Sequence, residues 1–175
     1  MTIKNRATVL AIFCVLASAC SKPVGDTNKA ASPAGDEPVT STGVVKVTPE
    51  ELTLVKGESG TANVRLQIQN GYHVNANPAT FPYLIATQLE ITTAGGVSVG
   101  AITYPDALTK TFSFSADAPL KVYEGDTTVR AMLKADAAAQ TGKHNLSAKL
   151  RVQACDDQVC YPPGTIDLTV PVTIK

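Results

Sequence analysis

The sequence predicts an all-β protein, an antiparallel β-sandwich that follows a signal peptide and a flexible linker. Three observations predict it. From Val44 to Lys175, apolar residues alternate with polar ones at the period of two that a half-buried strand requires. Turn residues such as Asn70-Gly71 and Gly95-Gly96 separate these runs at regular intervals. No stretch of this domain has the apolar spacing of a helix, and Asp136–Gln140 has room for one turn at most.

The composition is that of a globular chain whose main partner is not nucleic acid. Its 175 residues include 15 Lys and Arg and 15 Asp and Glu, so the formal net charge is zero. Phosphate binding needs an excess of positive charge on one face, and this balance argues against it. The apolar fraction of 44% is too high for a disordered chain. The length suits one domain with short additions.

Residues 1–19 are typical of a bacterial lipoprotein signal peptide. Lys4 and Arg6 precede an uncharged run, Ala7–Ala19, which is too short to cross a hydrocarbon core of about 30 Å. The run ends in Leu16-Ala17-Ser18-Ala19-Cys20, which resembles a lipobox. We therefore expect lipidation of Cys20, with an ordinary secretory signal cleaved near Ala19 as the alternative.

Residues 20–43 are expected to form the lipidated N-terminus and a disordered tether. The stretch is rich in Gly, Pro, Ser, Thr and Ala and has no aromatic residue, Leu or Ile after Cys20. We therefore expect a monomeric domain, residues 44–175, held at the periplasmic side of a bacterial membrane, where disulfides persist. Because Ser21 rather than an aspartate follows Cys20, the outer membrane is slightly favoured.

The strands can be placed in order from the alternation. The core-facing positions are expected to be, strand by strand, Val64, Leu66 and Ile68; Leu89 and Ile91; Val97, Val99 and Ala101; Val129, Ala131 and Leu133; Leu146, Ala148, Leu150, Val152 and Ala154; and Ile166, Leu168, Val170, Val172 and Ile174. Cys155 falls on the opposite register from Ala154, at a strand end. We expect its side chain to point toward solvent or a covering loop.

Cys155 and Cys160 are the two cysteines of the expected domain, and their spacing allows a disulfide. A structural disulfide across so short a loop would contribute only about 2 kcal/mol. As a redox pair, one thiolate would attack a partner disulfide and the other would resolve the mixed disulfide. A copper or zinc site with His73 is the third possibility. Two thiolates leave a zinc site incomplete, so we expect no metal and no other cofactor.

Two acidic residues, Asp156 and Asp157, follow Cys155 directly. Negative charge beside a thiol disfavours the thiolate and raises the thiol pKa. Such cysteines would react slowly until a partner docks. The alternative is that both aspartates are turn residues on a solvated loop.

The cysteine segment resembles a known family. Gln153-Ala154-Cys155-Asp156-Asp157, followed by Cys160-Tyr161-Pro162-Pro163, is similar to the N-terminal domain of the DsbD family of thiol:disulfide interchange proteins. The segments that agree with it in order are Asn70-Gly71-Tyr72-His73-Val74, Ile102-Thr103-Tyr104-Pro105 and Val122-Tyr123-Glu124-Gly125. The resemblance covers about Val44–Lys175.

The resemblance implies an immunoglobulin-like sandwich with Cys155 and Cys160 as a redox pair at its edge. Without tryptophan or two distant cysteines, this would be an immunoglobulin-like fold of the broader, non-antibody kind. The resemblance also implies a cap over the sulfurs, which by position would contain Val122, Tyr123 and Glu124. We expect the ring of Tyr123 to cover the cysteines, or alternatively to pack on the core.

His73 and Asn75 fall where the resemblance places aromatic residues beside the cysteines. His73 would either lower a thiol pKa or be a hydrogen-bonded surface residue. In the resemblance the second cysteine faces the partner, which indicates Cys160 as the attacking residue.

Two functions remain open. In the first, the protein is a lipid-anchored thiol–disulfide oxidoreductase that carries electrons from a separate transmembrane or thioredoxin-like partner to disulfides of exported proteins. In the second, it is a tethered β-sandwich interaction module without enzymatic activity, and its disulfide is structural.

Overall fold

The computed structural model describes residues 38–115 and 118–175. The expected signal peptide, Cys20 and the tether as far as residue 37 lie outside the described residues. Within the described part, no helix is long and apolar enough to cross a membrane. Its one helical element is a 3-10 turn, η1 (Ser113–Ser115), so the prediction of an all-β domain is confirmed.

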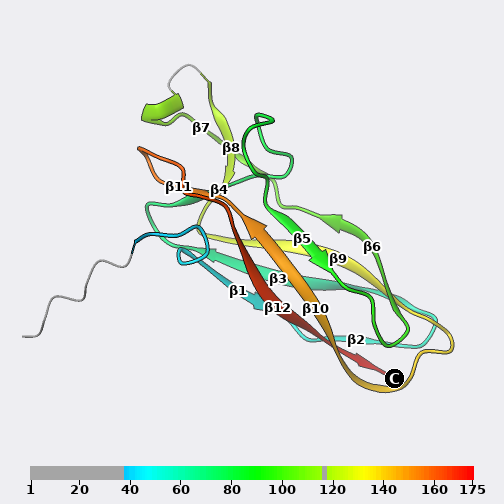
Figure 1. Cartoon of the computed structure of the whole chain (residues 1–175). Helices are drawn as coiled ribbons and strands as arrows, with labels where there is room; N and C mark the ends of the chain where they lie inside the picture. The colour runs from blue at the N-terminus through cyan, green and yellow to red at the C-terminus, as the bar shows by residue number, and fades with distance from the viewer. Residues whose placement is uncertain (1–37, 116–117) are drawn as a thin grey trace, which may run out of the picture. The chain divides into compact units, whose positions relative to one another are not determined.

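Two four-stranded sheets form the body of the domain (Figure 1). One sheet has the order β1 (Val45–Pro49), β3 (Ser59–Ile68), β9 (Asp126–Ala135), β6 (Val97–Thr103). The other has the order β2 (Leu52–Leu54), β12 (Gly164–Ile174), β10 (Gly142–Val152), β5 (Gln88–Ile91). The strand pairs within these sheets are antiparallel, as predicted, except β2 and β12 at one edge, which run parallel.

Alternate residues of the long strands bury one face of each sheet in a shared core. Val64 and Leu66 of β3 and Leu146 and Leu150 of β10 are each 0% exposed, whereas the polar residues Arg65, Ser147 and Lys149 between them are exposed. The prediction fails at Ala101, which is exposed. A bulge in β6 shifts its pairing with β9, so that Ile102 takes the inward place next to the core.

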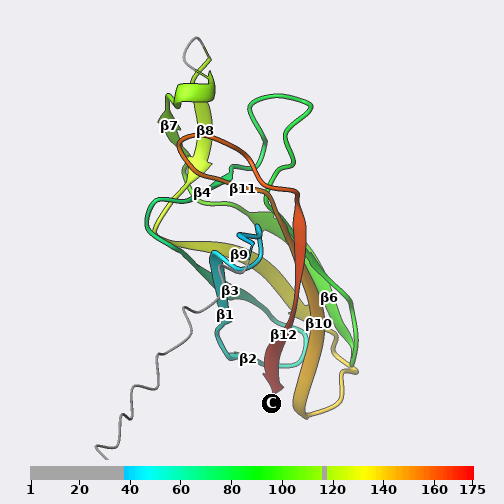
Figure 2. The ribbon, with the colours of Figure 1, turned by 60° about the vertical axis from the view of Figure 1, so that its left-hand side comes forward.

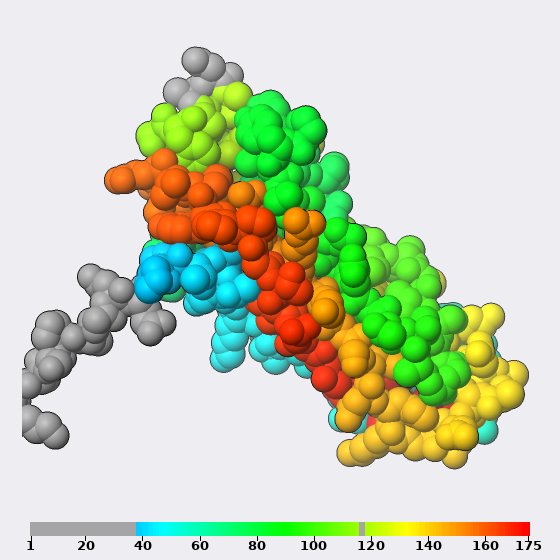
Figure 3. Space-filling model, in the orientation of Figure 1, coloured from blue at the N-terminus to red at the C-terminus, as the bar shows by residue number. Residues whose placement is uncertain are grey.

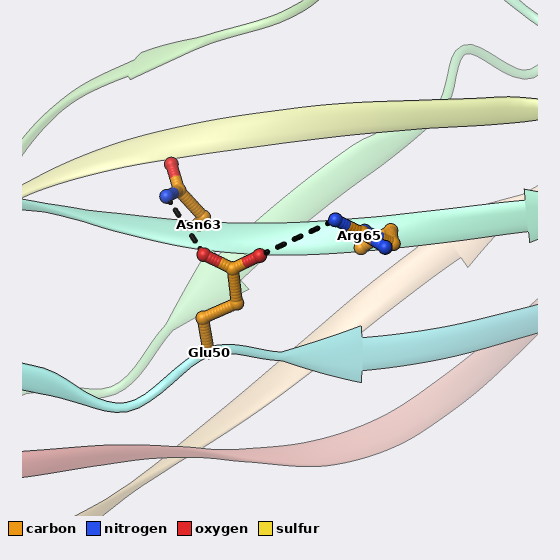
Figure 4. Close-up of polar contacts among 3 residues, drawn as sticks. All are labelled: Glu50, Asn63 and Arg65. Carbon is orange, nitrogen blue, oxygen red and sulfur yellow. Dashed lines mark hydrogen bonds and ion pairs between the residues drawn. The ribbon is translucent and has the colours of Figure 1, made fainter.

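The outer face of β3 carries the polar residues that the alternation predicts. Figure 4 shows Glu50, which follows β1, between Asn63 and Arg65. The Asn63 amide donates to Glu50 Oε2 at 2.9 Å, and Arg65 lies 3.8 Å from Oε1. These groups are solvent-exposed, so the ion pair contributes little to stability.

The described fold begins before Val44, within the stretch of residues 20–43 that the sequence predicts to be a tether. Ser41 is 1% exposed, and the turn at residues 40–43 closes through a hydrogen bond from Gly43 N to Thr40 O. Thr42 packs so closely on the start of β12 that a Cβ on Gly164 would lie 2.5 Å from its Cγ2. A side chain at residue 164 would therefore require Thr42 to move.

A third, smaller sheet lies at one end of the sandwich, away from the C-terminus (Figure 2). Its order is β11 (Ala154–Cys155), β4 (His73–Asn75), β8 (Leu120–Tyr123), β7 (Leu108–Lys110). In the space-filling view, the segments around β7 and β8 and the loop before β5 lie against the hairpin after β11 (Figure 3). This end of the domain holds both cysteines.

Candidate functional site

Cys155 and Cys160 form a disulfide across a short hairpin, with their Cα atoms 3.9 Å apart. The hairpin closes through two backbone hydrogen bonds. Tyr161 N donates to Ala154 O at 2.8 Å, and Asp156 N donates to Val159 O at 3.0 Å. The disulfide predicted as possible from the spacing is therefore present.

Asp156 stabilises the turn of this hairpin. Its Oδ1 accepts hydrogen bonds from the backbone N–H groups of Gln158 and Val159, and its Oδ2 accepts one from the Tyr161 hydroxyl at 2.6 Å. These bonds, led by the one from Tyr161, lower the pKa of Asp156, and the same contact raises the pKa of Tyr161 to about 12. The contacts of Asp156 therefore support the interpretation that it is a turn residue.

Ser41 fixes both ends of the hairpin. Its hydroxyl accepts a hydrogen bond from Ala154 N at 2.9 Å and donates one to Pro162 O at 2.7 Å. Ala154 is fully buried, so its N–H would otherwise have no access to water. The first turn of the domain therefore holds the disulfide segment in place.

Gln153 connects the hairpin to the loop before β5. Its Oε1 accepts hydrogen bonds from Ile85 N at 2.8 Å and from the Asn75 side chain at 3.0 Å, and its Nε2 donates to Tyr161 O at 3.3 Å. Asn75 also donates to Ile85 O at 3.2 Å. This buried polar network keeps β4, the loop and the hairpin together.

The two faces of the small sheet have different surroundings. Val74 is the in-register partner of both Ala154 and Tyr123, and these three residues pack in the main core. Cys155 is the in-register partner of His73, and this pair occupies the opposite face. Because Tyr123 and Cys155 lie on different faces, the expectation that the Tyr123 ring covers the sulfurs is wrong. The alternative, packing on the core, is correct.

The hydroxyl of Tyr123 supports this placement. It accepts a hydrogen bond from Asn77 N at 2.9 Å, and burial raises the pKa of Tyr123. Tyr123 therefore fixes the chain after β4 and is a structural residue.

A second apolar cluster covers the face that carries Cys155 and His73. It consists of Phe112, Leu120 and Val122, with Phe81 and Leu84 packed against it. Val122, a residue of β8 expected in the cap, packs in this cluster. Cys155 is 0% exposed, so of the two surroundings expected for it, solvent and a covering loop, the structure has the second.

Phe112 is the aromatic residue stacked over this face. Its ring lies on the His73 imidazole with the centroids 3.9 Å apart and the planes 13° from parallel. Phe114 extends the stack at 5.5 Å from Phe112. The Ser113 hydroxyl between them donates to the backbone oxygen of Asp157, so the segment is attached to the disulfide hairpin.

His73 is buried. The expectation that it could be a hydrogen-bonded surface residue is therefore wrong. His73 is 2% exposed, and its Nε2 has no hydrogen-bond partner among the described residues. Burial lowers the pKa of His73, whereas the carboxylates of Glu124, Asp157 and Asp156 act in the opposite direction. The imidazole is therefore neutral at pH 7.

Two cavities adjoin the site and share no lining residue. The first, here called the histidine cavity, has a volume of about 430 Å³ and is lined by His73, Lys110, Glu124 and Asp157 together with the turn at residues 69–72 and Gly125. Glu124 forms an ion pair with Lys110 there.

The second, here called the cysteine cavity, has a volume of about 420 Å³. Its lining residues are Tyr83, Leu84, Phe114, Ser115, Leu120, Gln153, Gln158, Val159 and Cys160. Cys160, which is partly exposed, therefore borders an open and largely apolar hollow that Cys155 does not line.

The described residues contain no group of three or more His, Cys, Asp or Glu that is placed to hold a metal ion. The geometry therefore gives no support to the copper or zinc site considered from the sequence.

The fold and the site define a class: a β-sandwich domain that carries a disulfide on a hairpin at its end, under an aromatic cover. Residues 43–171 match the family described as thiol:disulfide interchange protein DsbD, N-terminal, and the chain belongs to this family. Domains of the family relay reducing equivalents through a cysteine pair, and here the two cysteines are joined as a disulfide. The predicted immunoglobulin-like sandwich is confirmed.

Solved structures match the chain at low sequence identity. The chain is 21% identical to a protein in the complex between the DsbD N-terminal and PilB N-terminal domains from Neisseria meningitidis, with 62% of this chain and 73% of that chain covered and a TM-score of 0.43. It is 15% identical to the N-terminal periplasmic domain of ScsB from Proteus mirabilis, with 72% and 44% covered and a TM-score of 0.48. No curated protein matches the sequence.

Several residues of the site were not identified from the sequence. Phe112 stacks on His73, Phe114 lines the cysteine cavity, and Ser41 and Gln153 hold the hairpin. Two of the four phenylalanines of the chain lie two residues apart in the segment before β8, which was a signal for an aromatic cover. Ser41 gave no such signal, because its partner is distant in sequence.

Proposed function

We propose that this protein is a thiol–disulfide exchange module that passes electrons through Cys155 and Cys160. The observation that carries the proposal is the asymmetry of the disulfide. Cys155 is fully buried under the aromatic cover, whereas Cys160 is partly exposed and lines the cysteine cavity. A disulfide that only stabilised the loop would not need one sulfur beside an open apolar hollow.

The reaction begins at Cys160, because exchange requires access of a thiolate to the sulfur. The thiolate of a reduced partner attacks Cys160 Sγ and forms a mixed disulfide, while the Cys155–Cys160 bond breaks and Cys155 leaves as a thiolate that takes up a proton. The second thiol of the partner then displaces Cys160. The partner becomes the disulfide and the domain gains two electrons and two protons, which it passes to an oxidised client by the reverse steps.

Phe112, Phe114 and Leu120 are proposed as the cap of this site, with Val122 beneath it. Phe112 and Leu120 bury the face that holds Cys155, and Phe114 lines the cysteine cavity. Glu124 belongs to the wall of the histidine cavity, and Asp156 and Asp157 to the hairpin. The partners are proposed to be transmembrane or thioredoxin-like thiol–disulfide proteins, which would dock over Cys160.

The proposed location is the periplasmic side of a bacterial membrane, with the chain anchored by a lipid on Cys20. The signal-like sequence before Cys20 and the membership of the DsbD N-terminal family support it. Mass spectrometry of the protein purified from bacterial membranes is expected to show a lipid-modified N-terminal Cys20. A Cys20→Ser variant found in the membrane fraction at the wild-type level would contradict the anchor.

Trapping of mixed disulfides tests the proposed exchange. In reduced Cys155→Ser, the free Cys160 is expected to form a stable mixed disulfide with glutathione disulfide, because the displaced glutathione diffuses away. Cys160→Ser is expected to form little, because Cys155 is buried. If neither variant forms one, while both lose about 2 kcal/mol of stability, the protein is instead the interaction module with a structural disulfide.

A further inference from the structure

His73 is a buried titratable residue that the exchange steps above do not use. Its Nε2 is buried without a hydrogen-bond partner among residues 38–115 and 118–175. Native proteins rarely leave a buried polar atom unpaired, and a catalytic or redox role is one explanation for such an atom. The ring is held in one orientation by its stacking on Phe112.

The neighbour of His73 across the sheet is Cys155. The two residues are in-register partners of β4 and β11, and such partners have Cβ atoms about 5 Å apart and side chains on one face. Cys155 is fully buried, and burial disfavours the thiolate. Since only a thiolate attacks a disulfide, the reduced protein needs a group inside the site that accepts the proton of Cys155.

We propose that His73 is this proton acceptor. The proposal rests on the exchange function proposed above and assigns a residue to its last step. When reduced Cys160 has formed a mixed disulfide with an oxidised partner, neutral His73 takes the proton of the Cys155 thiol. The Cys155 thiolate attacks Cys160 Sγ, the Cys155–Cys160 bond forms, and the bond to the partner breaks. The partner sulfur leaves as a thiolate with the two electrons that the domain gives up.

The charges around His73 fit this role. Its neutral ring at pH 7 is the form that can accept a proton. Once protonated, the ring has three carboxylates near it, those of Glu124 on the strand end of β8 and of Asp156 and Asp157 on the hairpin. Lys110 on β7 opposes the positive charge, but it is paired with Glu124. Phe112, the other neighbour, is uncharged.

The proton also has a route to solvent that a docked partner would leave open. His73 lines the histidine cavity, whereas Cys160 lines the cysteine cavity, and the two have no lining residue in common. A partner that covers Cys160 therefore does not have to cover the cavity beside His73. Proton release would then occur at the histidine cavity and exchange with the partner at the cysteine cavity.

The kinetic test compares the full chain with the variants His73→Gln and His144→Gln. His144 is the matched control, because it is the second of the two histidines and lies on β10, outside the small sheet. Each reduced protein is mixed with glutathione disulfide and quenched in acid at set times. Mass spectrometry then measures the glutathione mixed disulfide and its conversion to the Cys155–Cys160 disulfide.

In wild type and His144→Gln, conversion is expected to be fast and to change little between pH 6.5 and pH 8, because the imidazole and thiol share one proton. In His73→Gln, it is expected to be on the order of 100-fold slower at pH 7. It should then rise with pH as the thiol ionises alone. Equal rates and equal pH profiles in the two variants would overturn the role of His73.

A second measurement uses the wild-type chain alone and therefore does not require any variant to fold. The ring signals of His73 and His144 are followed by NMR against pH in the oxidised and the reduced wild-type chain. His73 is expected to show an additional inflection only in the reduced chain, where the Cys155 thiol titrates beside it, and His144 the same curve in both. Identical His73 curves in the two states would contradict the proposal. If wild type forms no mixed disulfide at all, the exchange function itself is wrong.

Discussion

Cys155 and Cys160 are joined by one disulfide, yet Cys155 is fully buried beside His73 whereas Cys160 is partly exposed beside the cysteine cavity. The main-core face of the small sheet is closed by the sandwich, and the opposite face is closed by the Phe112 cluster. The difference in access follows from this arrangement. It determines which sulfur a partner reaches first.

Alkylation of the reduced protein is expected to follow this order. Iodoacetamide should modify Cys160 on the order of ten times faster than Cys155, because Cys155 reacts only after local opening of the cover. Peptide mass spectrometry after short reaction times at pH 8 measures both rates. Equal rates in the folded protein would show that the burial of Cys155 does not limit its reactivity.

Removal of the aromatic cover is expected to expose Cys155. Phe112→Ala deletes the ring that stacks on His73 and belongs to the second apolar cluster. If the cover opens more easily by about 1.4 kcal/mol, alkylation of Cys155 in the reduced protein becomes about tenfold faster.

Met132→Ala on the exposed side of β9 is the control for Phe112→Ala, and it should leave the alkylation rate of Cys155 unchanged. A Phe112→Ala protein that is folded but whose Cys155 is alkylated at the wild-type rate would show that Phe112 does not shield Cys155.

Ser41 is expected to stabilise the domain although it lies next to the tether. Ser41→Ala leaves the buried N–H of Ala154 without its acceptor and should lower the free energy of unfolding by about 1–3 kcal/mol. Urea denaturation of the oxidised protein measures the change. Ser98→Ala, which removes only an exposed contact of 3.4 Å to Lys134 O, should cost less than about 0.5 kcal/mol. Equal stabilities of the two variants would contradict the role of Ser41.

The stability of the oxidised protein is expected to fall as the pH decreases below the ordinary His pKa of 6.5. Burial lowers the pKa of His73 in the folded state, so the unfolded state binds more protons in this range, and stability is lost as the pH falls through the folded pKa. Thermal unfolding between pH 5 and pH 8 measures the slope. The slope of stability against pH should be nearly absent in His73→Gln and largely retained in His144→Gln. A slope that is the same in wild type and His73→Gln would contradict a buried neutral His73.

The sequence predicted the long strands because each has enough residues to show the alternation. Leu146, Leu150 and Val152 on β10 are buried as expected. It did not predict β4, β7, β8 and β11, which have two to four residues and too few periods to detect. Ala101 was misplaced because a bulge reverses the inward and outward positions, and nothing in the local sequence marks it.

The cysteine pair could be predicted from spacing and resemblance, but its surroundings could not. The position of Tyr123 relative to the sulfurs depends on which face of a short strand it occupies, and that is set by its pairing with Val74. The burial of His73 depends on Phe112, which is distant in sequence. Both are tertiary properties that a local pattern does not contain.

The reduction potential of the Cys155–Cys160 pair tests the central claim most directly. Thiol trapping across a series of redox buffers at pH 7 would measure it in the wild-type chain. An exchange module is expected to give a value between about −200 and −270 mV, in the range of known exchange proteins. A value below about −300 mV would be that of a structural disulfide and would contradict electron transfer through this pair.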